Sequence, residues 1–234
     1  MEKLEVEVWS DIACPWCYVG KRRLQASLEQ FPRRDAVKVV WRSFQLDPAA
    51  PAIPEEDVPV AERLAAKYGV SVDRAREMMD RAHQIAAAEG IELAQDRVRA
   101  SNTFDAHRVV HLAAQHGLAD AAVERLFRAH HSEGERLGDR EVLARLGGEV
   151  GLDPAEVRAM LAGGAYAGAV RDDQARARAL GVRGVPFFVF GGRYALSGAQ
   201  PAEVLGEALD RAWRERGPQA STSAAPGCEI DASS

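Results

Sequence analysis

The sequence predicts an α/β fold that carries a large all-helical insertion. Three observations support this prediction. A strand, a helix and a second strand follow one another within the first 43 residues. Residues 59–165 then show helical periodicity alone, without the alternation typical of strands. A helix, two strands and a last helix return after residue 165.

The first strand is predicted at residues 4–9, where aliphatic side chains alternate with two glutamates. A helix is expected over residues 18–30, where the apolar side chains lie on one side. Residues 37–43 predict a second strand. A strand–helix–strand unit normally forms a parallel pair with a right-handed crossover, so we expect that arrangement here.

The insertion is predicted to hold six helices. It follows residues 47–59, which are rich in proline and acidic residues. The first two helices end before Gly69 and Gly90, and the third is capped by Ser101 or Asn102. The sixth begins at Asp153, followed by a proline in the order typical of a helix start.

The β pattern returns after a helix over residues 167–180. Residues 185–190 and 193–196 predict a hairpin with a two-residue glycine turn at 191–192, and a final helix begins at Pro201. We therefore expect three parts. They are one domain formed by residues 1–50 and 166–216, a helical insertion at 51–165, and a disordered tail at 217–234, rich in Ser, Ala, Pro and Gly.

The first helix opens with the motif Cys14-Pro15-Trp16-Cys17. Two thiols at this spacing form a redox centre that makes, breaks or passes on a disulfide. Pro15 suits the first helical position, where a missing N–H costs nothing. Unpaired N–H groups and the helix dipole favour a thiolate at Cys14 and lower its pKa below the free value of about 8.5. Cys17, about one turn further on and more buried, is the expected resolving thiol.

The cysteine pair has two other interpretations. A mixed zinc site would recruit His107 and His111, but these lie about 90 residues from Cys17, a spacing that matches no compact zinc finger. We therefore expect no metal. The pair would otherwise be two inert buried cysteines, which the motif and its position disfavour.

Composition narrows the function classes. The net charge of −5 gives no support for a nucleic-acid surface. No apolar run approaches the length of a membrane span, so no membrane partner is expected. The first residues lack a basic segment followed by an apolar stretch, so the expected location is cytoplasmic. There thiols stay mostly reduced, which favours a catalytic pair over a structural disulfide.

Three stretches resemble one family, and the similarity spans about residues 4–216. They are residues 11–17 (DIACPWC), 101–108 (SNTFDAHR) and 181–190 (GVRGVPFFVF) with 197–200 (SGAQ). The chain resembles the DsbA-like superfamily, which has a thioredoxin fold with a helical insertion, and within it the FrnE-type branch. The resemblance implies a cis peptide bond between Val185 and Pro186 that faces the cysteines. It also implies that the free N–H and C=O of Val185 bind an extended substrate strand, a form of β-augmentation.

Two departures from the family pattern concern the thiols. The buried acid that often lies six residues before the nucleophile is replaced by Val8. Asp11 is nearer, and we expect it in an exposed turn, so Asp11, water or substrate would remove the proton of Cys17. Cys228 stands alone, with Ser223 where some FrnE-type proteins have a partner cysteine. It is either an accessory thiol, forming a mixed disulfide with Cys14 or a partner chain, or an exposed thiol without function.

The residues Phe104, His107 and His111 share one stripe of a predicted helix. They are either satisfied core or interface residues, or they line the cleft above Cys14. The pattern alone favours the first interpretation.

Three functions remain open. The first is a thiol:disulfide oxidoreductase or isomerase that acts on disulfide-containing or thiol protein substrates, or on small-molecule disulfides. It needs no cofactor, although glutathione is a candidate co-substrate. The second, from resemblance, is a glutathione-dependent enzyme related to 2-hydroxychromene-2-carboxylate isomerase and kappa-class glutathione transferase. The third is a holdase that grips extended segments. The sequence specifies neither the direction of electron flow nor the oligomeric state.

Overall fold

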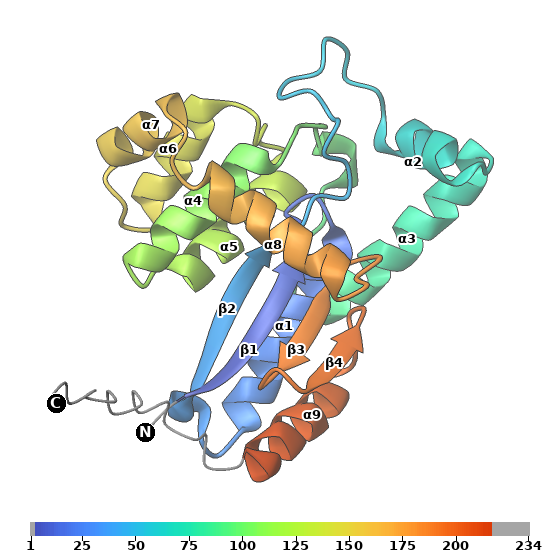
Figure 1. Cartoon of the computed structure of the whole chain (residues 1–234). Helices are drawn as coiled ribbons and strands as arrows, with labels where there is room; N and C mark the ends of the chain where they lie inside the picture. The colour runs from blue at the N-terminus through green and yellow to red at the C-terminus, as the bar shows by residue number, and fades with distance from the viewer. Residues whose placement is uncertain (1–2, 217–234) are drawn as a thin grey trace, which may run out of the picture.

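The computed structural model describes residues 3–216, which form a four-stranded sheet with helices on both faces (Figure 1). Strand β1 (Leu4–Ser10) lies in the centre, parallel to β2 (Val37–Ser43) and antiparallel to β3 (Phe187–Phe190). Strand β4 (Tyr194–Ser197) completes the order β2-β1-β3-β4. The predicted parallel pair is therefore present.

Helix α1 (Pro15–Gln30) lies behind the sheet and packs against α9 (Ala202–Glu215), whereas α8 (Ala167–Ala179) crosses the front (Figure 1). The apolar core is built around α1, because Val6, Val8 and Phe188 are at most 1% exposed and belong to the same cluster as Leu24 of α1.

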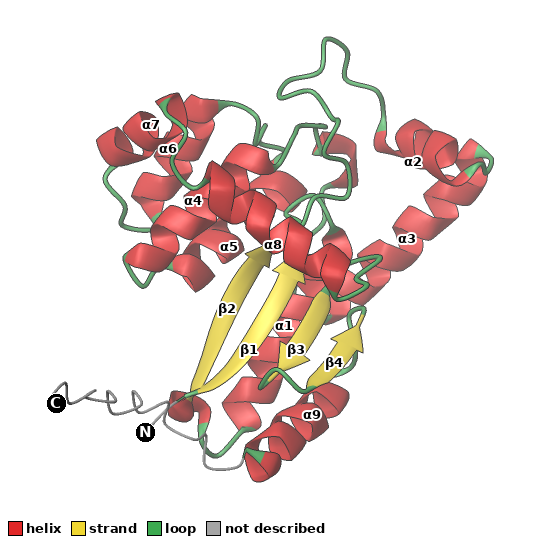
Figure 2. Cartoon of the chain, viewed as in Figure 1, coloured by secondary structure: helices red, strands yellow, loops and turns green. Residues whose placement is uncertain are grey.

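The insertion consists of helices, with no strand among residues 44–166 (Figure 2). The carboxyl ends of β1 and β2 point towards it (Figure 2). Its helices are α2 (Val60–Tyr68), α3 (Val72–Ala88), α4 (Phe104–Gln115), α5 (Ala119–Arg128), α6 (Arg140–Glu149) and α7 (Pro154–Ala162). Short 3₁₀ helices lie at Arg34–Ala36 and Gln95–Arg97. Six helices are present at about the predicted positions, and Asp153 caps α7, where its carboxylate accepts from the N–H of Ala155. The predicted cap of α4 is wrong by at least one residue. The N-cap is Thr103, although the side-chain oxygen of Asn102 accepts from the N–H of Phe104.

The predicted two-residue hairpin turn is wrong. Phe190 pairs with Tyr194, so three residues connect β3 to β4. Gly191 and Gly192 both have positive φ angles, 57° and 68°, and the N–H of Arg193 donates to the carbonyl of Phe190. Because Phe190 pairs with Tyr194 rather than with Arg193, Arg193 belongs to the connection and not to the strand.

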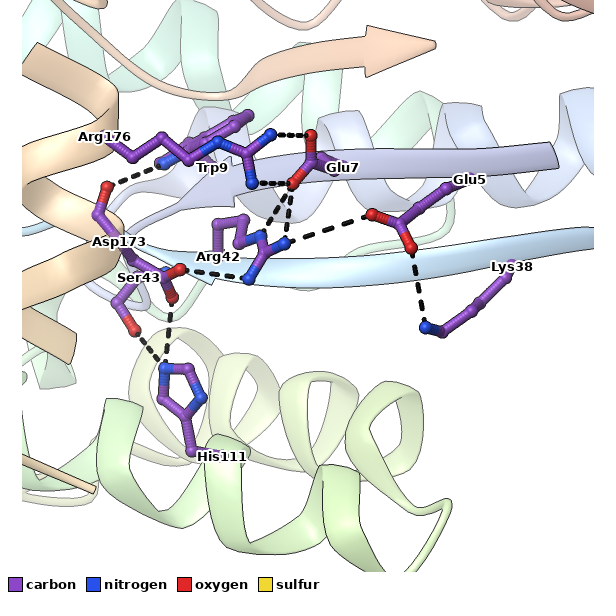
Figure 3. A network of polar contacts seen from close by, with 9 residues as sticks. All are labelled: Glu5, Glu7, Trp9, Lys38, Arg42, Ser43, His111, Asp173 and Arg176. Atoms are coloured by element: carbon purple, nitrogen blue, oxygen red, sulfur yellow. Dashed lines mark hydrogen bonds and ion pairs between the residues drawn. The ribbon is translucent and has the colours of Figure 1, made fainter. Parts of the chain in front are cut away.

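The face of the sheet beneath α8 is held by charged groups (Figure 3). Glu7 of β1 is only 4% exposed, and its carboxylate pairs with Arg42 of β2 at 2.7 Å and with Arg176 of α8 at 2.6 Å. Buried carboxylates are stable only when they are paired and hydrogen-bonded. The alternation of acidic and aliphatic residues in β1 thus separates an apolar face from a salt-bridged face.

Asp173 of α8 anchors the other end of this network (Figure 3). Its carboxylate accepts from the backbone N–H of Ser43 at 2.9 Å and lies 3.2 Å from Nη1 of Arg42 and 3.1 Å from Nε2 of His111. Its carbonyl accepts from Nε1 of Trp9 at 3.1 Å. Helix α8 is therefore fixed to the ends of both parallel strands.

No helix in residues 3–216 is both long and apolar enough to cross a membrane.

Candidate active site

Cys14 is the N-cap residue of α1, and Pro15 is the first helical residue, as the sequence predicts. The N–H of Cys14 donates to the carbonyl of Asp11 and the N–H of Cys17 to the carbonyl of Cys14, both at 3.0 Å. Cys14 and Cys17 are free thiols, 5% and 1% exposed respectively. The outer cysteine is thus at the helix N-terminus, with the inner one beneath it.

The pKa values of the two thiols are shifted in opposite directions. A hydrogen bond from the Cys17 side chain lowers the pKa of Cys14, assisted by the backbone N–H groups of Cys17 and Trp16 and opposed by burial and the Asp11 charge. Burial, together with the hydrogen bond to Cys14 and the charge on Cys14, raises the pKa of Cys17 well above its ordinary value. Cys14 is therefore suited to be the nucleophilic thiolate, and Cys17 stays protonated until it is needed.

A backbone carbonyl from the β3 side faces the outer thiol. The Sγ atom of Cys14 lies 3.7 Å from the carbonyl oxygen of Val185, and the Val185–Pro186 peptide bond is cis. Pro186 approaches α1 at Gly20, where an added Cβ would lie 2.8 Å from Cγ of Pro186. Trp16, 36% exposed, is the bulkiest side chain of the motif at the surface.

The expectation of an exposed Asp11 is wrong, since this residue is only 2% exposed. Its carboxylate accepts from the N–H of Leu46 at 2.7 Å and lies 3.6 Å from Nε2 of His107. Burial alone would raise the pKa of Asp11, but hydrogen bonds and the charge from His107, with the Leu46 N–H and Thr103, lower it. A carboxylate so fully engaged is a weak base, and it ties the turn before Cys14 to the segment after β2.

Of the stripe formed by Phe104, His107 and His111, His107 is the residue that is buried next to Asp11. His107 is 3% exposed, and its Nε2 lies 3.1 Å from the carbonyl of Phe44. His111 pairs with Asp173, and half-buried Phe104 lies under the guanidinium of Arg171 at 5.4 Å. His107 thus supports the turn through Asp11 from within.

A buried histidine beside the site was not expected from the sequence. His130 and His131, both 3% exposed, lie in a π-helical turn at Ala129–Glu133 that continues α5. Nε2 of His131 lies 3.0 Å from the carbonyl of Ile12. The apolar stripe of the fourth predicted helix includes His130, but adjacent residues do not share a helix face, so periodicity gave no signal for His131. Ser10 is also buried, and its Oγ atom has no hydrogen-bond partner within the described residues.

The structure shows no group of three or more metal-ligating side chains within residues 3–216. Cys228 and Ser223 lie outside the described residues, so the accessory-thiol prediction stays a prediction.

Known proteins share this architecture. The model of the DSBA-like thioredoxin domain family matches residues 5–210. A probable DsbA oxidoreductase from Streptomyces coelicolor is 46% identical, with a TM-score of 0.86 and 92% of each chain covered. The cytosolic disulfide reductase DsbM from Pseudomonas aeruginosa, solved with GSH, is 22% identical with a TM-score of 0.60, covering 90% of this chain and 96% of that one. A 2-hydroxychromene-2-carboxylate isomerase is 17% identical with a TM-score of 0.67, covering 90% and 96%. The last two similarities show the fold alone.

Proposed function

Since this chain belongs to the DSBA-like thioredoxin domain family, we propose that it is a thiol:disulfide oxidoreductase that acts through Cys14 and Cys17. One observation carries the proposal. Cys14 is a free thiol at the N-cap of α1, where helix N–H groups favour a thiolate, and Cys17 is a second free thiol buried one turn further on. This placement separates an attacking sulfur from a resolving one.

The reaction proceeds by two thiol–disulfide exchanges. The Cys14 thiolate attacks one sulfur of a substrate disulfide, and the S–S bond breaks as a mixed disulfide forms. The departing substrate thiolate takes up a proton. Cys17 then loses its proton and attacks Sγ of Cys14, which releases the second substrate thiolate and leaves a Cys14–Cys17 disulfide. Two electrons and two protons pass to the substrate, and the reverse sequence oxidises a dithiol.

The surroundings of Cys14 support a polypeptide substrate. The Val185 carbonyl beside the thiol offers an acceptor to an extended backbone, and exposed Trp16 offers an apolar surface. The substrates are therefore disulfide-containing or thiol proteins, in the manner of the FrnE-type branch. The activity includes disulfide isomerisation, and the protein acts in the cytoplasm.

A glutathione-dependent reaction is the second candidate, favoured by the shared fold with the isomerase and with the GSH-bound reductase. The related isomerases and transferases usually have a serine at the nucleophile position, whereas this chain has Cys14 and retains Cys17. Turnover of an aromatic substrate with glutathione, independent of Cys17, would favour this alternative.

For the holdase alternative, the double variant Cys14→Ser, Cys17→Ser should still suppress client aggregation.

The first test is the equilibrium of the Cys14–Cys17 pair in glutathione redox buffers, with alkylation and mass counting of the thiols. We expect a reversible disulfide. A potential near −270 mV would indicate a reductase, and one of about −180 mV or higher would indicate an isomerase or oxidant. If no disulfide forms between these two residues at any potential, the proposed function is wrong.

Single-thiol variants test the assigned roles. We expect Cys14→Ser to lose exchange activity to background, because the attacking thiol is absent and Cys17 is only 1% exposed. Cys17→Ser should instead accumulate a mixed disulfide at Cys14, because the resolving thiol is absent. The trapped species is identified by non-reducing electrophoresis and mass spectrometry. Trapping by Cys14→Ser rather than by Cys17→Ser would reverse the assignment.

A further inference from the structure

The π-helical turn after α5 is an irregularity next to the site. The N–H of Gly134 donates to the carbonyl of Ala129, five residues earlier, which is the π-helical pattern. Such widened turns often occur at functional sites. This one buries His131, whose ring has no place in the two-step exchange described above.

His131 contacts the residues that flank the thiols on both sides. Its Nε2 lies 3.0 Å from the carbonyl of Ile12, two residues before Cys14. Its ring stacks on Tyr18, the residue after Cys17, with ring centroids 6.3 Å apart. Its own carbonyl accepts from the N–H of Ala94 at 2.8 Å, which fixes the turn to the segment after α3.

The protonation of this ring follows from its contacts. A carbonyl oxygen only accepts hydrogen bonds, so Nε2 must carry the hydrogen that meets Ile12. Burial, followed by the neighbouring His130, lowers the pKa of His131 well below its ordinary value. The ring is therefore neutral, and its single N–H hydrogen is committed to Ile12.

We propose that His131 is a positioning residue for Cys14. Its Nε2–H group holds the Ile12 carbonyl, and this contact keeps Cys14 at the N-cap of α1, within reach of the N–H groups that stabilise its thiolate. The inference rests on the proposed function. Without the donor, the buried carbonyl has no partner, and the turn must shift to satisfy it. That shift moves the sulfur relative to the helix end and to Val185.

A matched pair of substitutions isolates the hydrogen bond. In His131→Gln the amide nitrogen lies three bonds from Cβ, as Nε2 does in histidine, so a donor remains. In His131→Met the terminal methyl group lies at the same place without a donor. Both variants lose the ring stacking on Tyr18 equally. His116→Gln, at a site 44% exposed beside Glu156, is the surface control.

Two readouts are needed. The first is the pH dependence of alkylation at Cys14, followed by mass spectrometry, which reports the thiolate independently of any substrate. The second is the rate of exchange with a peptide disulfide. We expect His131→Met to raise the pKa of Cys14 and to slow exchange roughly tenfold or more, as displacement of a reacting group by about 1 Å does. His131→Gln should keep most of both properties, and His116→Gln should match the parent protein.

The outcomes separate this inference from the proposed function. Equal behaviour of the Gln and Met variants, whether both are impaired or neither is, would overturn the role of the hydrogen bond. Absence of exchange in the parent protein would overturn the function, while the alkylation profiles still test His131. Should the Met variant not fold, ¹⁵N NMR of the parent protein decides. An Nε2–H tautomer at His131 supports the inference, and an Nδ1–H tautomer rejects it.

Discussion

At the scale of single residues, Gly20 shows how the site depends on a missing side chain. It is buried on the face of α1 that meets Pro186, and a Cβ there would lie 2.8 Å from Cγ of Pro186 and 3.2 Å from Cζ of Phe188. A proline ring has little freedom to move aside, so the close approach of α1 to Pro186 requires glycine. This approach also sets the position of the Val185 carbonyl next to Cys14.

We therefore expect Gly20→Ala to destabilise the protein by about 1–2 kcal/mol, because overpacking exceeds the helix-propensity gain of up to about 1 kcal/mol. Exchange at Cys14 should slow as Pro186 is displaced. Chemical denaturation and the exchange assay measure both effects. The matched control is Gly206→Ala in α9, where the new Cβ would lie 3.6 Å from Oγ of Ser27, an ordinary contact. That variant should be more stable than the parent, and a stabilised Gly20→Ala would contradict the steric argument.

At the scale of elements, α8 docks on the sheet through buried charge as well as through apolar contacts. Asp173 is 5% exposed and binds groups from both β2 and α4, namely the Ser43 N–H, Arg42 and His111. Burial would raise the pKa of Asp173, but the hydrogen bond to His111, with those to Ser43 and the charge of Arg42, lowers it. A carboxylate whose pKa is lower in the folded state stabilises the protein above its unfolded pKa of about 3.9. That contribution is lost as the pH falls through the folded pKa.

Asp173→Asn should lower the free energy of unfolding at pH 7 by about 3 kcal/mol, because it removes the buried carboxylate charge that pairs with the half-buried Arg42 and accepts from the Ser43 N–H. Equilibrium denaturation measures the change. The control is Asp210→Asn in α9, where the carboxylate is 54% exposed and 3.9 Å from Arg214, so the expected change is below about 1 kcal/mol. Equal losses in the two variants would refute the special role of the buried network.

At the scale of the whole molecule, buried neutral histidines couple folding to pH. Burial lowers the pKa of His130 to about 4, and burial likewise lowers that of His131. The unfolded chain takes up a proton at His130 near pH 6.5, whereas the folded protein does so only near pH 4. Between these values the unfolded state binds more protons, so stability must fall as the pH is lowered.

For His130 this loss amounts to roughly 3 kcal/mol between pH 6.5 and 4. The substitution His130→Leu should flatten the pH dependence of the unfolding free energy in this window, because it removes one titrating group whose Nδ1 has no hydrogen-bond partner in the described structure. Urea titrations at several pH values provide the measurement. An unaltered slope in His130→Leu would show that His130 is not the coupled group.

Local patterns in the sequence predict the order of the elements and the location of the thiols. Strand and helix periods differ, so β1 and the helices could be read locally. Cys14 could be placed at a helix N-terminus because a strand ends just before it and Pro15 suits the first turn. The resemblance of residues 181–190 to the family pattern pointed to Val185 and Pro186 as the segment facing the cysteines, and that segment lies there.

The residues that surround the thiols come from segments far apart in the chain, so local patterns do not predict them. Asp11 looked exposed because it follows a strand in a polar turn, yet Leu46 and His107 close over it from segments 35 and 96 residues away. His131 reaches Ile12 through a π turn that has no sequence period. The hydrophobic period and the short motifs of a sequence predict the local backbone conformation and the side of a helix or strand that is apolar. Long-range packing decides which polar groups become buried, which pKa values shift and which side chains hold the turn before the nucleophile.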